Sequence, residues 1–187
     1  MQNTIYNKQW LINELKAKPK LKYLYFWGHT PKSNGQMSNA CFSQWYDSPF
    51  VVDDVIYPTA EHYMMAQKAK LFGDMDIFNQ IIHSKHPKQA KDLGRQVKNF
   101  DETIWNKHRF EIVVQGNIAK FSQHPELKAY LLGTGDRILV EASPVDKIWG
   151  VGLAKDNEKI HNPLNWQGLN LLGFALMQVR DELIKNG

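Results

Sequence analysis

The chain of 187 residues is long enough to bury a sizeable core, and its 43% apolar and 22% charged content is ordinary for a soluble globular protein. A single cysteine, Cys41, excludes an internal disulfide and fits a reducing, cytoplasmic setting. The net charge of +4 is compatible with phosphate-bearing ligands or nucleic acid but requires neither. We expect no metal site, because no Cys/His spacing is typical of zinc ligands. We expect no membrane span, because no run approaches about 18 apolar residues.

The first part of the chain predicts two helices, a strand and a hairpin. Apolar residues at near-helical spacing predict a helix over 3–17, and the aromatic run 22–27 predicts a strand. Glycine, proline and asparagine make 28–39 a loop, and two apolar runs split by a pair of aspartates predict a hairpin over 50–57. A helix then follows over 60–70.

The second part of the chain is mainly helical. We expect helices over 74–83, 87–93, 102–122, 125–132 and 169–184, and one short strand over 138–140. The segment 142–168 is rich in Asp, Asn, Gly and Pro, and loops of this length in compact domains are often functional. The expected fold class is therefore α+β, mainly α: a single compact helical domain with a few short strands.

The helix over 60–70 carries a charged pair on one face. Thr59 can cap its start, and Glu61 and Lys68 are seven residues apart, so they lie within roughly 20° of each other around the axis. A carboxylate and an amine separated by apolar residues suggest the wall of a cleft. The alternative is a surface Glu and a surface Lys on an amphipathic helix. A carboxylate in the first turn is favoured by the backbone dipole, which suits a base or a cation stabiliser.

Two basic residues have two interpretations each. Lys68 is a useful nucleophile only if an apolar pocket, which Met64 and Met65 would provide, lowers its pKa; otherwise it is a snorkelling lysine. Arg95 follows Gly94, and its guanidinium suits bidentate phosphate binding. The alternative for Arg95 is a cation at the C-cap of a helix.

Three further residues are candidates for a stacking pocket around a sugar. Trp105 lies on the long helix, where a tryptophan is more often core than ligand platform. After the strand over 138–140, a polar loop presents Asp146 and Trp149 beside glycines that let a ligand approach the backbone. Asp146 would hold a ribose hydroxyl while Trp149 stacks on a base; the alternative is a turn with a solvent-exposed aspartate.

Taken together, these stretches resemble one family, the NADAR or YbiA-like N-glycosidases, from about Tyr23 to Leu183. The resemblance depends on the order and spacing of many short pieces: Phe26-Trp27-Gly28, Met37-Ser38-Asn39, Tyr57 to Tyr63 with Lys68, Gly94-Arg95, Trp105, Ala119-Lys120-Phe121, Leu139-Val140-Glu141, Asp146 with Trp149-Gly150, and Asn170 to Gly173 with Leu176-Met177 and Arg180. Residues 1–20 lie outside it, so the expected organisation is an N-terminal helical extension over 1–20 and a NADAR domain over 21–187.

The resemblance implies hydrolysis of the bond between C1′ of a phosphorylated ribose and a nitrogen of its base, without a cofactor. Substrates associated with the family are ribosylamino-pyrimidine phosphates of the riboflavin pathway, and ADP-ribose attached to guanine, free or in nucleic acid. It also places Gly28 and Asn39 among the substrate-binding residues, with Arg95, Trp105 and Trp149. The catalytic set would be Glu61, Asp146 and Lys68, the two carboxylates acting around one ribose.

Three alternatives remain open at the level of sequence. Lys68 either neutralises phosphate or attacks C1′ of the opened ribose to form a Schiff base. The protein would otherwise be a non-catalytic module that binds ADP-ribose or a nucleotide with the same Arg, Trp and Asn groups. A third interpretation, based on the charge and the aromatic content, is a nucleic-acid-binding protein whose affinity falls steeply with salt.

Overall fold

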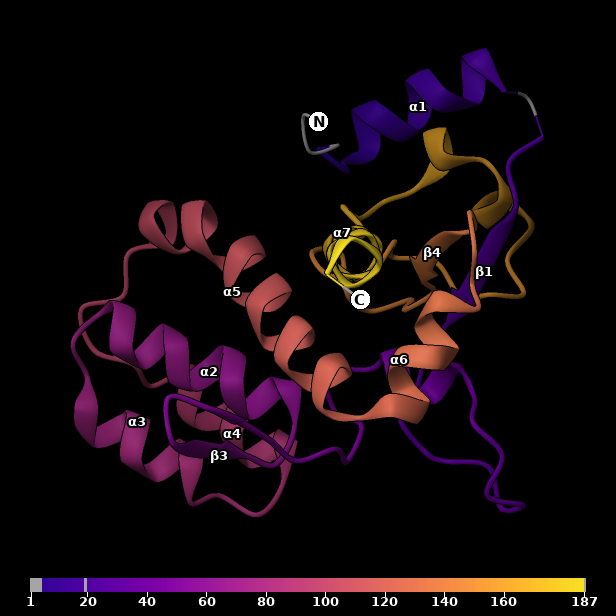
Figure 1. Ribbon diagram of the computed structural model, residues 1–187. Helices are drawn as coiled ribbons and strands as arrows, with labels where there is room; N and C mark the ends of the chain where they lie inside the picture. Colours follow the sequence, from indigo (N-terminus) through magenta and orange to yellow (C-terminus); the bar gives the residue numbers. More distant parts are fainter. Residues whose placement is uncertain (1–4, 19, 187) are drawn as a thin grey trace. The chain divides into compact units, whose positions relative to one another are not determined.

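Helices dominate the computed structural model, which describes residues 5–18 and 20–186 (Figure 1). The longer helices are α1 (Lys8–Ala17), α2 (Ala60–Leu71), α3 (Met75–Ile82), α4 (Pro87–Gly94), α5 (Glu102–Gln123), α6 (Pro125–Leu132) and α7 (Leu171–Lys185). The strands are β1 (Tyr23–Phe26), β2 (Phe50–Val52), β3 (Val55–Tyr57) and β4 (Ile138–Glu141), and the 3₁₀ helices are η1 (Asn39–Phe42), η2 (Glu158–His161) and η3 (Pro163–Asn165). The chain divides into two compact units, Gln44–Leu127 and the remainder, and each is described by itself.

The unit of residues 44–127 is built around α2. Helices α3, α4 and α5 all pack on α2 (Figure 1), and eight of its twelve residues are buried. The hairpin pairs β2 with β3 in antiparallel register, with Phe50 opposite Tyr57. Both rings contact Tyr63 of α2, at centroid distances of 5.9 Å and 5.0 Å. The aromatic contacts therefore fix the direction in which the chain enters α2.

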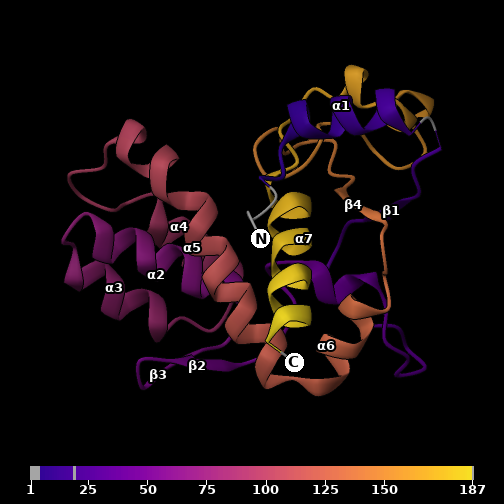
Figure 2. The same cartoon turned by 45° about the horizontal axis from the view of Figure 1, so that its top comes forward.

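The other unit is built around a two-stranded parallel sheet and α7. Strands β1 and β4 pair in parallel, with Phe26 opposite Glu141, and α7 packs against β4. Figure 2 shows α1 near the beginning of α7, where Trp10 lies edge-on against Phe174 with ring centroids 6.5 Å apart. Nearly all of the first nine residues of α7 are buried, so α7 is the main core helix of this unit.

The predicted fold class, mainly helical with a few short strands, is confirmed. Thr59 caps the helix that it was expected to cap, accepting a hydrogen bond from His62 N, and Asp101 caps α5 by accepting from Ile104 N. The first helix was predicted to start at residue 3, and residues 3 and 4 lie outside the described residues. Over the described residues the prediction was wrong, since the helix begins at Lys8. It begins there because the Asn7 side chain accepts a hydrogen bond from Trp10 N and caps it.

Other departures concern short elements. Helix η1 lies at the end of the predicted loop, and η2 and η3 lie in the segment 142–168, because serine and asparagine side chains cap single turns there. In the parts of the chain that the structure describes, no helix is both long and apolar enough to cross a membrane. The division of the sequence at residue 20 stays a prediction, and residues 1–4 and 19 of that extension lie outside the described residues.

Candidate active site

Glu61 lies in the first turn of α2 and is only 3% exposed. Its backbone N–H donates to Gln44 O (2.9 Å), and the Gln44 side chain accepts from Asn117 Nδ2 (2.8 Å). The interpretation of Glu61 as a surface carboxylate was therefore wrong, because the entry to α2 is covered by residues of the same unit. A carboxyl group shielded from bulk water at a helix N-terminus acts more strongly on a nearby charge than it would at the surface.

The start of α2 is locked by a buried histidine. The Thr59 hydroxyl lies 2.8 Å from His62 Nδ1, and His62 Nε2 lies 3.1 Å from Ser84 O. Because a carbonyl only accepts, the proton is on Nε2, and Nδ1 accepts from the hydroxyl. Burial lowers the pKa of His62, which keeps the ring neutral in this role. His62 is thus a structural histidine, and it holds Glu61 in place from the neighbouring position.

Lys68 lies two turns further along α2, in a cage of aromatic rings. Its Nζ is 4.1 Å from the centroid of Phe100 and 5.8 Å from that of Trp105, and it donates to Gly94 O at 2.8 Å. Cation–π contacts and a carbonyl acceptor both favour a charged ammonium held in one direction. The described contacts of Nζ are therefore with Phe100, Trp105 and Gly94, while the flanking Met65 packs on the Gly94 backbone, where a Cβ atom would come within 2.2 Å of its sulfur.

The pKa of Lys68 is lowered, first by burial and then by the positive charge of Arg95. Arg95 is the C-cap residue of α4, as one of the two interpretations proposed, and its side chain is 69% exposed. It pairs with Asp92 at 3.3 Å, a weak surface contact. The guanidinium therefore remains accessible to a ligand, and it brings a second cation close to Lys68.

In the other unit, the predicted residues gather at the carboxyl end of the parallel strands β1 and β4. Gly28 follows β1 with a φ of +82°, a conformation that glycine adopts without strain. The Asn39 side chain donates to Tyr25 O (3.1 Å) and accepts from Tyr130 Oη (2.8 Å). The Asn39 amide therefore connects β1 to α6, and one N–H of Nδ2 is left for a ligand.

Asp146 organises the loop that follows β4. Its Oδ1 accepts from the backbone N–H groups of Ile148 (2.8 Å) and Trp149 (2.7 Å), and Ser143 Oγ accepts from its own N–H (3.2 Å). Asp146 is half-buried, and its Oδ1 builds the turn that the alternative interpretation predicted. One oxygen is used by the turn, while Oδ2 takes part in no hydrogen bond among the described residues. This arrangement ties the backbone of Trp149 to the Asp146 carboxylate.

The structure thus brings the predicted site residues together in two groups. Lys68 is on α2, the same helix as Glu61, and Arg95 at the end of α4 and Trp105 of α5 lie near its amine. Gly28 and Asn39 lie at the end of β1, and the loop with Asp146 and Trp149 leaves β4 beside it, since Phe26 pairs with Glu141.

Sequence reasoning missed Phe100, whose ring makes the shortest aromatic contact with Lys68. A signal for it was present. Phe100 immediately precedes the N-cap Asp101 and Trp105 is the fourth residue of α5, which are the two positions of a hydrophobic staple. The staple pattern predicts that the two rings lie close together at the entry to α5, where Lys68 meets both.

A model of the NADAR domain family matches residues 25–184. The chain is 46% identical over 167 residues to a protein named N-glycosidase R617 from Acanthamoeba polyphaga mimivirus, which covers 86% of this chain and 96% of that relative. It is 35% identical over 139 residues to the riboflavin biosynthesis protein PYRR of Zea mays, covering 71% of this chain but 20% of that protein.

Among solved structures, the chain resembles the NMR structure of the Escherichia coli protein YbiA. The TM-score is 0.70 and the identity 29%, with 88% of this chain and 86% of that one covered. The family model and the mimivirus relative both extend over most of the chain. The chain therefore belongs to the NADAR domain family.

Proposed function

We infer that the protein is an N-glycosidase, a hydrolase that cleaves the bond between C1′ of a ribose and a nitrogen of its base. The observation that carries this inference is Glu61, a carboxyl group that is 3% exposed at the mouth of a helix that presents Lys68 two turns further along. Cleavage of a C1′–N bond develops positive charge on the ribose, and a carboxylate shielded from water stabilises such a charge well. The naming of relatives as N-glycosidases supports the same activity.

The substrate is proposed to be a small ribosyl compound that carries phosphate. Two classes fit: ribosylamino-pyrimidine phosphates of the riboflavin pathway, and ADP-ribosyl-guanine, free or in nucleic acid. The name of the maize relative favours the first class. The accessible guanidinium of Arg95 beside the ammonium of Lys68 supplies the two positive charges that either kind of phosphate requires. A cytoplasmic location, expected from the single cysteine, belongs to this proposal.

Glu61 is proposed to stabilise the cationic ribose or to orient the attacking water. Asp146 is the second carboxylate, with Oδ1 fixed in its turn and Oδ2 directed to the ribose hydroxyls or to the leaving nitrogen. Trp105 and Trp149 shape the base pocket, and Gly28 and Asn39 contribute a close backbone approach and one N–H. Because Trp105 is 9% exposed, it acts as a wall of the pocket and not as a free stacking surface.

Lys68 has two roles that experiment separates. As an ammonium it neutralises phosphate. As a neutral amine it bonds to C1′ while the base leaves with a proton; the ring then opens to an imine, and water hydrolyses the imine to release the sugar and the amine. Burial and Arg95 lower the pKa of Lys68 and support the second role, whereas the aromatic cage and Gly94 O support the first. Borohydride would reduce the imine to a stable adduct of the protein.

The activity is tested by incubating the protein with a ribosylamino-pyrimidine phosphate and, separately, with ADP-ribosyl-guanine. Free base released from either, measured by chromatography, identifies the substrate class. A second portion is treated with borohydride and examined by mass spectrometry. An adduct that disappears in Lys68→Ala assigns the covalent role, and full turnover without any adduct removes it.

The same assay separates catalysis from mere binding. A module that binds ADP-ribose or a nucleotide would show saturable binding of both compounds and release no base. Such a result would reject the N-glycosidase and leave the binding module as the function of this fold.

A further inference from the structure

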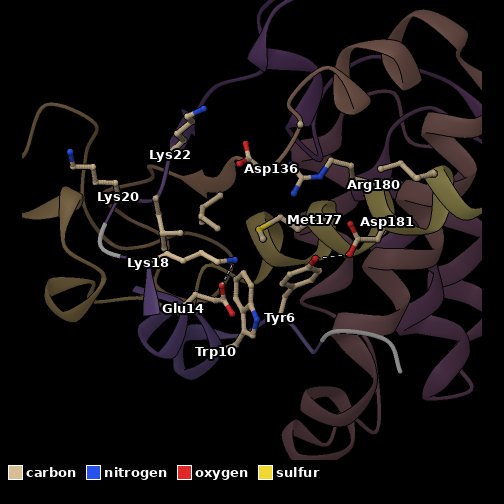
Figure 3. A pocket seen from close by; sticks show the side chains of 14 residues that line it. Tyr6, Trp10, Glu14, Lys18, Lys20, Lys22, Asp136, Met177, Arg180 and Asp181 are labelled. Carbon is tan, nitrogen blue, oxygen red and sulfur yellow. Dashed lines mark hydrogen bonds and ion pairs between the residues drawn. The ribbon is translucent and has the colours of Figure 1, made fainter. Parts of the chain in front are cut away.

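A cavity of about 380 Å³ lies in the unit that contains α1 and α7 (Figure 3). Its walls are α1 with Tyr6, two residues before it, residues 18 and 20–22, the turn before β4 with Ile138 of that strand, and the second half of α7. None of the residues proposed for the N-glycosidase site lines it. The volume is within the range of small-molecule sites. Half of its lining residues precede residue 25, where the family match begins, so this cavity depends on the N-terminal part of this chain.

The buried charge at this cavity is Arg180, which is 4% exposed. Its Nη1 donates to Thr134 Oγ1 (2.8 Å) and to Arg137 O (3.0 Å), and both acceptors are neutral. Among the described residues Arg180 forms no ion pair, and Nε and Nη2 have no acceptor. Figure 3 shows the guanidinium between Asp136 and Met177. A buried cation without a paired anion is unfavourable, and the remaining donors form a fork that matches a carboxylate or phosphate.

The charges around Arg180 also indicate a site for an anion. Burial lowers its pKa, and the charges of Asp181 and Asp136 and the hydroxyl of Tyr6 only partly oppose this effect. The Asp181 carboxylate accepts from the Tyr6 hydroxyl at 2.5 Å, so it already has a partner. Asp136 is exposed at the rim and does not pair with Arg180. An incoming anion would supply the charge that these two carboxylates provide only from a distance.

The rim of the cavity adds a further cation that is easily released. Lys18 extends over the opening towards Glu14, at 3.4 Å (Figure 3), and its side chain is 72% exposed. Such a surface pair contributes little stability, so Lys18 can exchange Glu14 for a ligand at small cost. Lys20 and Lys22 point away from the cavity in the same view and raise only the general positive potential at its mouth.

Apolar side chains also line the cavity. The Trp10 indole is half-buried at the cavity, held edge-on by Tyr6 at 4.7 Å, and Met177 lies opposite it in Figure 3. A rigid indole facing a thioether is a suitable surface for a planar ring. A ligand that satisfies both parts therefore carries a flat ring and one anionic group.

We propose that the cavity between α1 and α7 is a binding site for a small anionic aromatic compound, whose carboxylate or phosphate pairs with Arg180 and Lys18 while its ring packs between Trp10 and Met177. The site is distinct from the residues proposed for N-glycosidic cleavage, and its occupation needs no turnover.

The test follows the indole N–H of Trp10, assigned with Trp10→Phe, by ¹⁵N-resolved NMR of the full chain. Three probes are titrated: indole-3-carboxylate, adenosine monophosphate and inorganic phosphate. A saturable shift with a ring-bearing probe is expected, and whichever of the two ring compounds binds more tightly identifies carboxylate or phosphate as the anion. The proposal would be overturned if neither ring compound gave a saturable shift, or if inorganic phosphate bound as tightly as the ring compounds.

Variants test the charges without disturbing the core. Replacement of Arg180 would also break its contacts with Thr134 and Arg137, so the decisive variants are at the rim. Lys18→Ala should weaken binding at least threefold, whereas Lys16→Ala, on the same helix but outside the cavity, should leave binding unchanged. Asp136→Asn should strengthen binding, because it removes a negative charge that repels the anionic ligand. Binding that responds to neither Lys18→Ala nor Asp136→Asn would place the probe elsewhere and overturn the proposal.

Discussion

At the scale of single residues, the environment of Lys68 decides what the amine can do. Its ammonium is held by two aromatic rings and a carbonyl, while burial and Arg95 favour the neutral form. These effects oppose each other, so a modest change of charge nearby should move the balance measurably. Arg95 is the residue to change, because its side chain is mostly exposed and its replacement leaves the core intact.

Arg95→Gln should raise the pKa of Lys68. Removal of the like charge favours the protonated amine, so the neutral, reactive form appears only at higher pH. The expected shift is a few tenths of a pH unit, since the guanidinium is largely solvated. Reductive methylation of the protein over a pH series, with Lys68 quantified by peptide mass spectrometry, measures it. Lys70, exposed on the same helix, is the internal reference; equal movement of both midpoints, or none of Lys68, contradicts this account of its environment.

At the scale of elements, the turn after β4 gives Asp146 two separable functions. Its Oδ1 holds the backbone of Ile148 and Trp149, and its charge is proposed to serve the chemistry. Asparagine keeps an oxygen in the same position but has no charge, whereas alanine has neither. The pair of substitutions therefore distinguishes a structural aspartate from a catalytic one.

Asp146→Asn should retain the folded turn and lose at least tenfold in kcat, whereas Asp146→Ala should also lower the free energy of unfolding by about 1–3 kcal/mol. Thermal unfolding and base release, measured on both variants, check this. Unchanged turnover in Asp146→Asn together with the expected loss of stability in Asp146→Ala would show that the residue only builds the loop.

Gly173 tests the contact between α7 and β4. A Cβ atom there would come within 2.1 Å of Leu139 O and 2.6 Å of Asn170 Nδ2, the group that itself donates to Leu139 O. Gly173→Ala should therefore destabilise the protein by about 1–3 kcal/mol, although the same change in a solvent-exposed helix stabilises by about 1 kcal/mol. Denaturant unfolding measures whether the free energy of unfolding falls or rises. A gain in stability would contradict the prediction and show that α7 moves away from β4 without cost.

The elements themselves were largely predictable, because their signals are local. Thr59, Asp101 and Pro125 mark helix starts by side chains that cap or fix the first turn, and Gly94 marks an end. The parallel pairing of β1 with β4 was not predictable from either strand, since more than a hundred residues separate them. The contacts of Phe100 and the structural use of Asn39 likewise depend on tertiary packing that no periodicity encodes.

At the scale of the whole molecule, the proposed chemistry draws on residues from both units. Glu61 and Lys68 belong to one unit, and Asp146 and Trp149 to the other. The resemblance to a family located these residues in the sequence, and the structure showed their local roles. The central claim is that the Glu61 and Asp146 carboxylates both act in breaking a single C1′–N bond.

The most direct measurement is the rate of base release by Glu61→Gln, Asp146→Asn and the double variant, on whichever ribosyl substrate the paired assay identifies. Glu102→Gln, a first-turn carboxylate on the exposed start of α5, is the matched control. The account predicts a loss in kcat on the order of 10²-fold or more for Glu61→Gln with folding intact, and a double variant that loses less than the product of the single losses, because the two groups serve one step. Normal turnover in folded Glu61→Gln, or in Asp146→Asn, would contradict it.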